Sequence, residues 1–260
     1  MIPIQWFLNK RINIKLVISC TLSLGLIVTS AALGSYAPGN QKPVPKDRRS
    51  DGGTTRGCSG GDIPLTVIAS GNYVGRTISP HPTFAWFVPG DSVSKPMKFM
   101  IYEWVPSGKP KEVRKIPLQS SPGIMKLSPF SENELGLQPG KEYSLQVVIH
   151  CDPDNPSGDL VDEASIEVVK MPATVQTKLN RAVNSVEKAN IYAEAGLWYN
   201  ALDEALKLAQ VSKLGEVGST LLKDLAKREA PKTIPELPSK EREAIEKRIE
   251  NLKQIADSAR

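Results

Sequence analysis

The segment Tyr143-Ser-Leu-Gln-Val-Val-Ile149 decides the fold class of this chain of 260 residues. It starts with alternating apolar and polar side chains and ends as a continuous apolar run, a pattern typical of a central strand in a packed sheet. The turn sequence Leu137-Gln-Pro-Gly-Lys141 lies directly before it. The segment therefore predicts a β-sandwich with this strand in its interior.

Further short apolar runs lie on both sides of this strand, separated by proline and glycine. About seven strands over roughly 110 residues is the size of an immunoglobulin-like antiparallel β-sandwich. We expect this domain at residues 62–171, with Trp86 as a core aromatic. The predicted strands are Leu65–Ala69, Thr83–Val88, Met97–Val105, Val113–Leu118, Gly123–Leu127, Glu142–Ile149 and Leu160–Val169.

The apolar period changes to that of a helix in Ala189–Ala209, and Gly196 fits a tight turn between two helices. This stretch resembles one tetratricopeptide-type unit, although arrays of such units normally contain three or more. We expect residues 172–230 to form a helical hairpin followed by a third helix, Gly215–Glu229. The positions that match the packing pattern of the unit are Tyr192, Gly196, Ala201 and Leu208.

Residues 231–260 indicate a proline-punctuated spacer followed by a charged helix that begins near Ser239. A narrow apolar seam runs along this helix. The favoured interpretation is a surface helix that packs on its own protein, and the alternative is a helix that binds a partner or self-associates. The seam consists of Ile245, Ile249, Leu252 and Ile255.

The N-terminus has the parts of a secretory leader, which we predict at residues 1–37. Basic residues precede the uncharged, mostly apolar stretch Leu16–Leu33, and the cleavage candidates are Thr29-Ser-Ala31 and Ser35-Tyr-Ala37. The alternative is an uncleaved membrane anchor, because the apolar run is close to the minimum for a spanning helix. The leader predicts a periplasmic or extracellular protein. We expect a disordered linker after the leader, at residues 38–61.

The charge of the chain argues against nucleic-acid binding. With 23% charged and 40% hydrophobic residues, the composition is that of a globular protein. The formal net charge is +5, but Lys10, Arg11 and Lys15 belong to the leader, and five minus these three leaves only +2. No basic stripe interleaved with aromatic residues is visible in the rest of the chain.

Two cysteines, Cys58 and Cys151, remain after the leader. In an oxidising compartment such a pair is more often a disulfide than two free thiols. The bond would close a loop of roughly 90 residues, worth about 4–5 kcal/mol in the chain-entropy model. A catalytic Cys151 served by His150 is disfavoured, since neighbours in a strand point to opposite faces.

Catalytic motifs are absent from the sequence. It has no phosphate loop and no nucleophile elbow, and His81 and His150 are its two histidines. His81 is read as a structural loop residue in preference to a functional one. Non-enzymatic function without a cofactor is therefore predicted.

A weak calcium-site candidate consists of Asp152, Asp154 and Glu163, at offsets one, three and twelve of a calcium loop. Pro156 and Ser157 do not fit that loop, and a polar hairpin turn explains the same residues better.

Four aromatic residues are candidates for contact with a ligand or partner. Tyr102 and Trp104 share a face of one strand, where they form either a sugar-binding platform or part of the core. Trp198 and Tyr199 stand at the turn of the predicted helical hairpin, where a partner could meet them.

Several motifs together resemble a cyanobacterial family described as domain of unknown function 928, over roughly Arg56 to Ala230. The resemblance implies an exported protein with a β-domain and a helical end. It implies no established activity, cofactor or functional residue. The motifs are Arg56-Gly-Cys58, Asp62-Ile-Pro-Leu-Thr66, Pro82-Thr-Phe-Ala-Trp-Phe-Val-Pro89, Ile149-His-Cys-Asp152 and Tyr192-Ala-Glu-Ala-Gly-Leu-Trp-Tyr-Asn-Ala-Leu202.

The sequence thus predicts an exported binding or scaffold protein of the cell envelope without catalytic activity. Its partner would be an envelope protein or polysaccharide, and it would contact a membrane only through an uncleaved leader. The alternative is a carbohydrate-binding module for envelope or extracellular polysaccharide.

Overall fold

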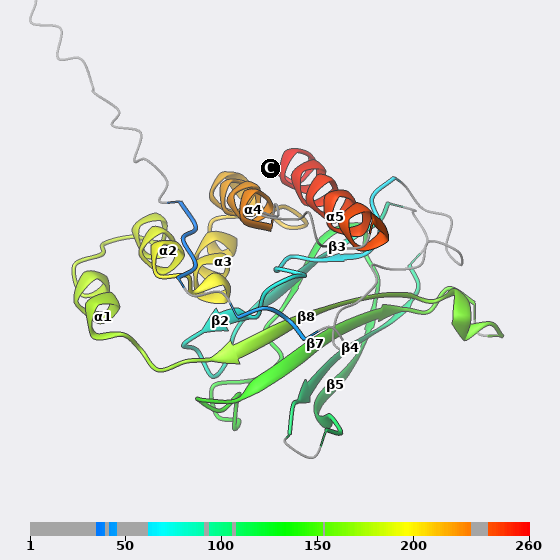
Figure 1. Cartoon of the computed structure of the whole chain (residues 1–260), viewed down its shortest axis with the longest axis horizontal. Helices are drawn as coiled ribbons and strands as arrows, with labels where there is room; N and C mark the ends of the chain where they lie inside the picture. The colour runs from blue at the N-terminus through cyan, green and yellow to red at the C-terminus, as the bar shows by residue number, and fades with distance from the viewer. Residues whose placement is uncertain are drawn as a thin grey trace, which may run out of the picture. The chain divides into compact units, whose positions relative to one another are not determined.

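Within the described residues of the computed structural model, eight strands form two sheets (Figure 1). The structure describes residues 35–39, 42–45, 62–90, 94–105, 108–152, 154–229 and 239–260. The three-stranded sheet has the order β1 (Thr66–Val67), β3 (Phe84–Val88), β6 (Gly123–Leu127). The five-stranded sheet has the order β2 (Gly75–Thr77), β8 (Leu160–Val168), β7 (Glu142–Ile149), β4 (Pro96–Glu103), β5 (Lys111–Gln119).

The predicted central strand is β7, which pairs antiparallel with β8 on one side and β4 on the other. The two sheets meet through aromatic side chains. The ring of Phe99 on β4 lies 5.6 Å from that of Phe84 and 5.7 Å from that of Trp86, both on β3. All three are fully buried, so Trp86 is a core residue as predicted.

The five-stranded sheet is mixed and not wholly antiparallel, because β2 pairs in parallel with β8. The expectation of an antiparallel sheet is wrong at this edge. β2 has only three residues, which is too short for a recognisable apolar period. The α+β class is confirmed, and no closed barrel forms among the described strands.

Five α-helices follow the strands in the part of the chain that the structure describes: α1 (Ala173–Leu179), α2 (Ser185–Glu194), α3 (Trp198–Lys207), α4 (Gly215–Glu229) and α5 (Ser239–Ser258). The side chain of Asn184 caps α2 by accepting from the backbone N–H of Glu187 at 2.9 Å. Gly196 turns the chain between α2 and α3 with a φ of 70°, a region that favours glycine. α4 has the predicted bounds.

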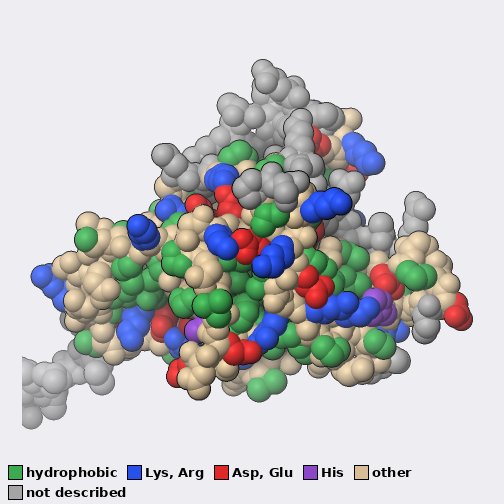
Figure 2. Space-filling model, turned by 90° about the horizontal axis from the view of Figure 1, so that it is seen from below, with side chains coloured by type: hydrophobic (Ala, Val, Ile, Leu, Met, Phe, Trp, Pro, Cys, Tyr) green, Lys and Arg blue, Asp and Glu red, His purple; other side chains and the backbone are tan. Residues whose placement is uncertain are grey.

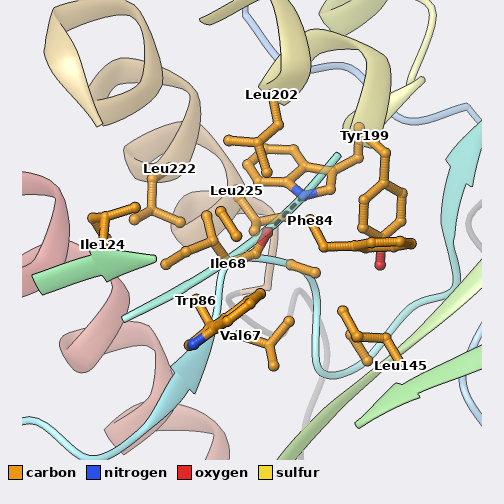
Figure 3. Close-up of a cluster of buried hydrophobic side chains, with 14 of the residues drawn as sticks. Val67, Ile68, Phe84, Trp86, Ile124, Leu145, Tyr199, Leu202, Leu222 and Leu225 are labelled. Carbon is orange, nitrogen blue, oxygen red and sulfur yellow. Dashed lines mark hydrogen bonds between the residues drawn. The ribbon is translucent and has the colours of Figure 1, made fainter. Parts of the chain in front are cut away.

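One core joins the strands to the helices (Figure 3). Phe84 of β3 meets Tyr199 of α3 edge-on at 5.4 Å between ring centroids. The indole N–H of Trp198 donates to the backbone carbonyl of Ile68 at 2.9 Å. The described residues belong to one compact unit, so residues 62–171 and 172–229 do not bury separate cores.

Part of the predicted linker is ordered against the β-region. Val44 is only 3% exposed, and its N–H donates to the carbonyl of Asn72 at 2.9 Å. The expectation of a disordered linker at residues 38–61 is therefore wrong at Val44, because backbone pairing holds this residue in place. Residues 46–61, Cys58 among them, lie outside the described residues.

The C-terminal helix α5 packs beside α4 (Figure 1). Leu252 and Ile255 of its apolar seam are fully buried, and Ile249 is 8% exposed. These contacts confirm the interpretation of a helix that packs on its own protein. None of the described helices is long and apolar enough to cross a membrane.

Candidate ligand-binding pocket

A pocket of about 270 Å³ lies between the β2–β3 loop and the helical hairpin α2–α3. The loop supplies residues 78–82, α2 supplies one tyrosine, and α3 supplies the remaining wall. Polar side chains predominate among the lining residues. They are Ile78, Ser79, His81, Pro82, Tyr192, Tyr199, Asn200, Asp203 and Glu204.

His81 is held by the loop that follows β6. Its Nε2 lies 2.9 Å from the carbonyl oxygen of Glu134, and the carbonyl of Pro80 accepts from the N–H of Leu137 at 2.8 Å. Gly136 lies so close to Pro80 and His81 that a Cβ there would collide with both. This close approach explains why glycine stands at that position.

The carboxylate of Glu134 fixes the same loop from its other side. It accepts two hydrogen bonds from Arg114 at 2.7 and 2.8 Å and two from Ser131, one from the N–H at 2.7 Å and one from the hydroxyl at 3.1 Å. The guanidinium of Arg114 and the two hydrogen bonds from Ser131 lower the pKa of Glu134 to about 2. The backbone carbonyl of Glu134, which accepts from Nε2 of His81, is thereby held in position.

Asn200 forms the inner wall and connects α3 to the β2–β3 loop. Its Oδ1 accepts from the N–H of Ile78 at 2.9 Å and from the hydroxyl of Thr77 at 3.1 Å. Only 9% of Asn200 is exposed. Because a backbone N–H can only donate, the contact with Ile78 identifies which amide atom is the oxygen.

Two carboxylates, Asp203 and Glu204, share one lysine at the pocket. Lys207 lies 3.0 Å from Asp203 and 2.8 Å from Glu204, and Asp203 also accepts from the hydroxyl of Thr83 at 2.5 Å. Burial, followed by the nearby carboxylate of Glu204, raises the pKa of Tyr192 above its ordinary value. The wall therefore carries acceptor oxygens beside a half-buried hydroxyl.

Of the residues singled out in the sequence, His81, Tyr192 and Tyr199 line this pocket. Trp198 and Tyr199 are 0% and 1% exposed, so neither forms an exposed partner surface, and that expectation is corrected. The cause is packing, because the first turn of α3 is buried within the shared core.

Tyr102 and Trp104 lie elsewhere and are half-buried. Tyr102 belongs to β4, and its hydroxyl donates to the sulfur of Met100 at 3.2 Å. Neither residue lines the pocket, and a role for them in sugar binding stays a prediction.

The calcium candidates do not assemble. No cluster of metal-ligating side chains occurs among the described residues. Asp152 accepts from the N–H of Asp154 within a turn, whereas Glu163 lies on β8 and bonds Gln146 of β7. His150 pairs with Asp159 at 2.7 Å.

The predicted disulfide would join Cys151 to Cys58. Because Cys58 lies outside the described residues, the disulfide stays a prediction.

Sequence reasoning missed Asn200, Asp203 and Glu204 as site residues. Their spacing of three and four along α3 places them on one side of the helix. In the sequence this spacing is indistinguishable from the solvated face of an amphipathic helix. Only the approach of the β2–β3 loop converts that face into a pocket wall.

Figure 2 shows one face of the molecule, on which basic and acidic side chains are interspersed. Among the described side chains of that face, no patch of one charge sign predominates. A polyanion such as nucleic acid would find no continuous basic stripe there.

The fold and the pocket define a mixed α+β protein with a small polar site between its strands and helices. The sequence matches the family described as Domain of Unknown Function (DUF928) over residues 51–228, and the chain belongs to this family. No curated protein matches the chain. α5 lies C-terminal to the matched residues, although it packs on the same core.

Proposed function

We propose that this chain is an exported binding protein of the cell envelope that holds a small polar ligand in the pocket and does not transform it. The observation that carries the proposal is the convergence of His81, Asn200 and Glu204 on one cavity. Concave sites with a few well-placed polar groups are the usual form of small-molecule sites.

Binding is favoured over catalysis because a neighbouring residue occupies one polar atom of each candidate acid–base group, and the sequence carries no catalytic motif. His81 is tied to the carbonyl of Glu134, and Lys207 neutralises part of the charge on Asp203 and Glu204. The two carboxylates come from consecutive positions on one helix, and Lys207 contacts both of them.

Export, with a leader at the N-terminus and a Cys58–Cys151 disulfide in an oxidising compartment, belongs to the same proposal. The proposal also includes an immunoglobulin-like arrangement of the two sheets and a tetratricopeptide-like packing of α2 on α3. The support is the leader pattern, the aromatic contact between the sheets and the hairpin turn at Gly196. Family membership is compatible with all of these and specifies none.

The test uses the purified chain and the small-molecule fraction of an envelope extract from the host organism. Molecules retained by the protein are released and identified by mass spectrometry. Ser79→Trp places a bulky side chain at the pocket wall. Ser121→Trp makes the same change at an exposed position in the β5–β6 turn, and serves as the matched control.

We expect a molecule that the unmodified chain and Ser121→Trp both retain and that Ser79→Trp loses, recovered with its mass unchanged. Circular dichroism and a melting curve establish that both variants fold. Equal retention by Ser79→Trp would contradict the site, and recovery of a chemically altered molecule would contradict the absence of catalysis.

A further inference from the structure

We propose that the pocket binds one neutral, hydroxyl-rich sugar ring. This inference rests on the proposed binding function and names its ligand class. Its basis is the set of hydrogen-bonding atoms that the fold leaves unused around the cavity. These atoms include donors and acceptors, and only certain ligands can satisfy both.

The side chain of Asn200 leaves a donor unused. Its Oδ1 is occupied by Thr77 and Ile78, as described, while its Nδ2 has no partner among the described residues. An amide nitrogen of this kind donates and cannot accept. The ligand therefore needs at least one acceptor atom at the inner wall.

Acceptors are left unused on two other residues. Since a backbone carbonyl cannot donate, the contact with Glu134 places the proton of His81 on Nε2, and Nδ1 of the neutral ring is an acceptor. Glu204 accepts from Lys207 through Oε1, and its Oε2 has no partner in the part of the chain that the structure describes. The ligand therefore needs donors as well.

Tyr192 adds a group that serves both purposes. Its hydroxyl can donate or accept and has no partner among the described side chains and backbone atoms. A sugar hydroxyl has the same dual character, so a ring with several adjacent hydroxyls can meet all of these groups at once. An apolar ligand would leave them buried and unpaired, which costs about 1–3 kcal/mol for each group.

The charges around the pocket disfavour ionic ligands. An anion such as phosphate would face the two carboxylates of Asp203 and Glu204, whose charge Lys207 offsets in part. A cation would compete with Lys207, which already contacts both carboxylates at 2.8–3.0 Å. A neutral ligand meets neither penalty.

Size restricts the ligand to one ring. The pocket volume of about 270 Å³ is slightly below the range of about 300–1,000 Å³ in which drug-sized ligands bind. A single pyranose fits this volume, whereas a second ring would have to extend outside. The ring is therefore either a free monosaccharide or the end of a longer glycan.

The test is isothermal titration calorimetry with the purified full chain. The neutral probes are glucose, galactose and mannose. Glucuronate, inorganic phosphate and 1,4-diaminobutane are the charged probes. Any monosaccharide that binds is then compared with a trisaccharide built from the same sugar. If the pocket recognises the end of a glycan, the trisaccharide should bind at least as tightly as the monosaccharide. If the pocket recognises a free monosaccharide, the trisaccharide should bind more weakly.

We expect saturable binding of at least one neutral hexose and at least tenfold weaker binding of every charged probe. Tyr192→Phe removes only the hydroxyl and should weaken hexose binding about tenfold. Tyr73→Phe makes the same change outside the pocket and should leave the affinity unchanged. Glu204→Gln retains the size of the side chain and should also weaken binding.

Binding of a charged probe in preference to every hexose would overturn the ligand class, while leaving a pocket that still binds. Equal hexose affinity in Tyr192→Phe and Tyr73→Phe would overturn the site. If no probe binds while the envelope extract yields a ligand that Ser79→Trp loses, the sugar inference fails and the proposed function survives. If no probe binds and the envelope extract yields no ligand, the sugar inference and the proposed function both fail.

Discussion

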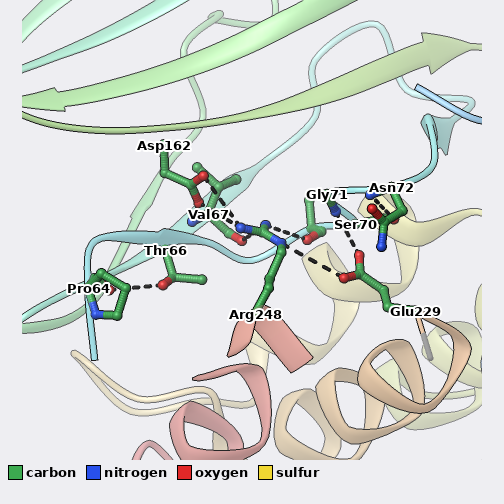
Figure 4. A network of polar contacts seen from close by, with 10 residues as sticks. Pro64, Thr66, Val67, Ser70, Gly71, Asn72, Asp162, Glu229 and Arg248 are labelled. Carbon is green, nitrogen blue, oxygen red and sulfur yellow. Dashed lines mark hydrogen bonds and ion pairs between the residues drawn. The ribbon is translucent and has the colours of Figure 1, made fainter. Parts of the chain in front are cut away.

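The guanidinium of Arg248 on α5 joins parts of the chain that are far apart in the sequence (Figure 4). It donates to Asp162 of β8 and to the backbone carbonyls of Val67 and Ala69, at 3.1–3.4 Å. Its Nε lies 3.9 Å from Glu229 at the end of α4. Only 17% of its side chain is exposed, so the two carboxylates depend on it for compensation of their buried charge.

Arg248→Met should therefore destabilise the protein by about 3–5 kcal/mol, because it leaves two buried carboxylates without their cation. Urea unfolding at neutral pH measures the change. Lys247→Met, at an exposed neighbouring position, should change stability by less than about 0.5 kcal/mol. Adding Glu229→Gln to Arg248→Met should recover part of the loss. Equal stability of the two single variants would show that the buried network contributes nothing.

The lowered pKa of Glu134 predicts how the stability of the protein changes with pH. Its pKa falls from 4.5 to about 2 in the folded protein, chiefly through the hydrogen bond from Arg114. A depressed carboxyl pKa contributes stability that is complete above about pH 4.5 and is lost as the pH falls towards 2. Melting temperatures between pH 6 and pH 2.5 should therefore fall more steeply for the unmodified chain than for Glu134→Gln.

The control for this pH effect is Glu132→Gln, on the same exposed loop. Its acid profile should follow that of the unmodified chain. Parallel profiles for all three proteins would contradict the role of the Arg114–Glu134 pair in holding the loop that supports His81.

At the scale of elements, local periodicity predicted β6, β7 and α4 with their observed bounds. It failed for β2, since three residues carry no period, and its parallel pairing with β8 depends on residues about ninety positions away. The pocket residues likewise divide into those that are visible in the local sequence and those that depend on distant parts of the chain. His81 is conspicuous in the sequence as one of two histidines, whereas Asn200 and Glu204 become site residues only through tertiary packing.

The docking of α5 yields a second stability prediction. Leu252→Ala removes a fully buried side chain from α5, the helix that packs on α4. It should cost about 2–5 kcal/mol through lost burial and the resulting cavity. Lys253→Ala, on the exposed side of the same helix, is the matched control. If both variants unfold at the same urea concentration, α5 does not stay docked in solution.

At the scale of the whole molecule, segments outside the family match complete the core. Tyr36 meets Trp198 edge-on at 5.1 Å, and α5 closes the other end of the helical layer beside α4. Tyr36 is only 4% exposed. The folding unit thus extends beyond the matched residues 51–228 at both ends. Removal of the proposed leader would consequently affect folding, because one predicted cleavage position would delete part of the core.

If the leader is removed, the cut should fall before Tyr36, after a position such as Ala31 and not after Ala37. The N–H of Ala37 donates to the carbonyl of Ala193 at 2.9 Å, and the α2–α3 turn at Gly196 approaches Pro38 closely. A chain beginning at Pro38 would lose the ring that covers Trp198. The intact mass of the exported protein should therefore include Tyr36.

Stability measurements provide the matching test. Tyr36→Ala should cost about 3–5 kcal/mol, the range for removing a large buried aromatic side chain, whereas Tyr36→Phe keeps the ring and should retain most of the stability. An exported form that begins at Pro38 and unfolds at the same urea concentration as the longer chain would contradict this role. In that case Trp198 would have to be covered by another part of the protein, since a bare indole at the centre of the shared core would expose apolar surface to water.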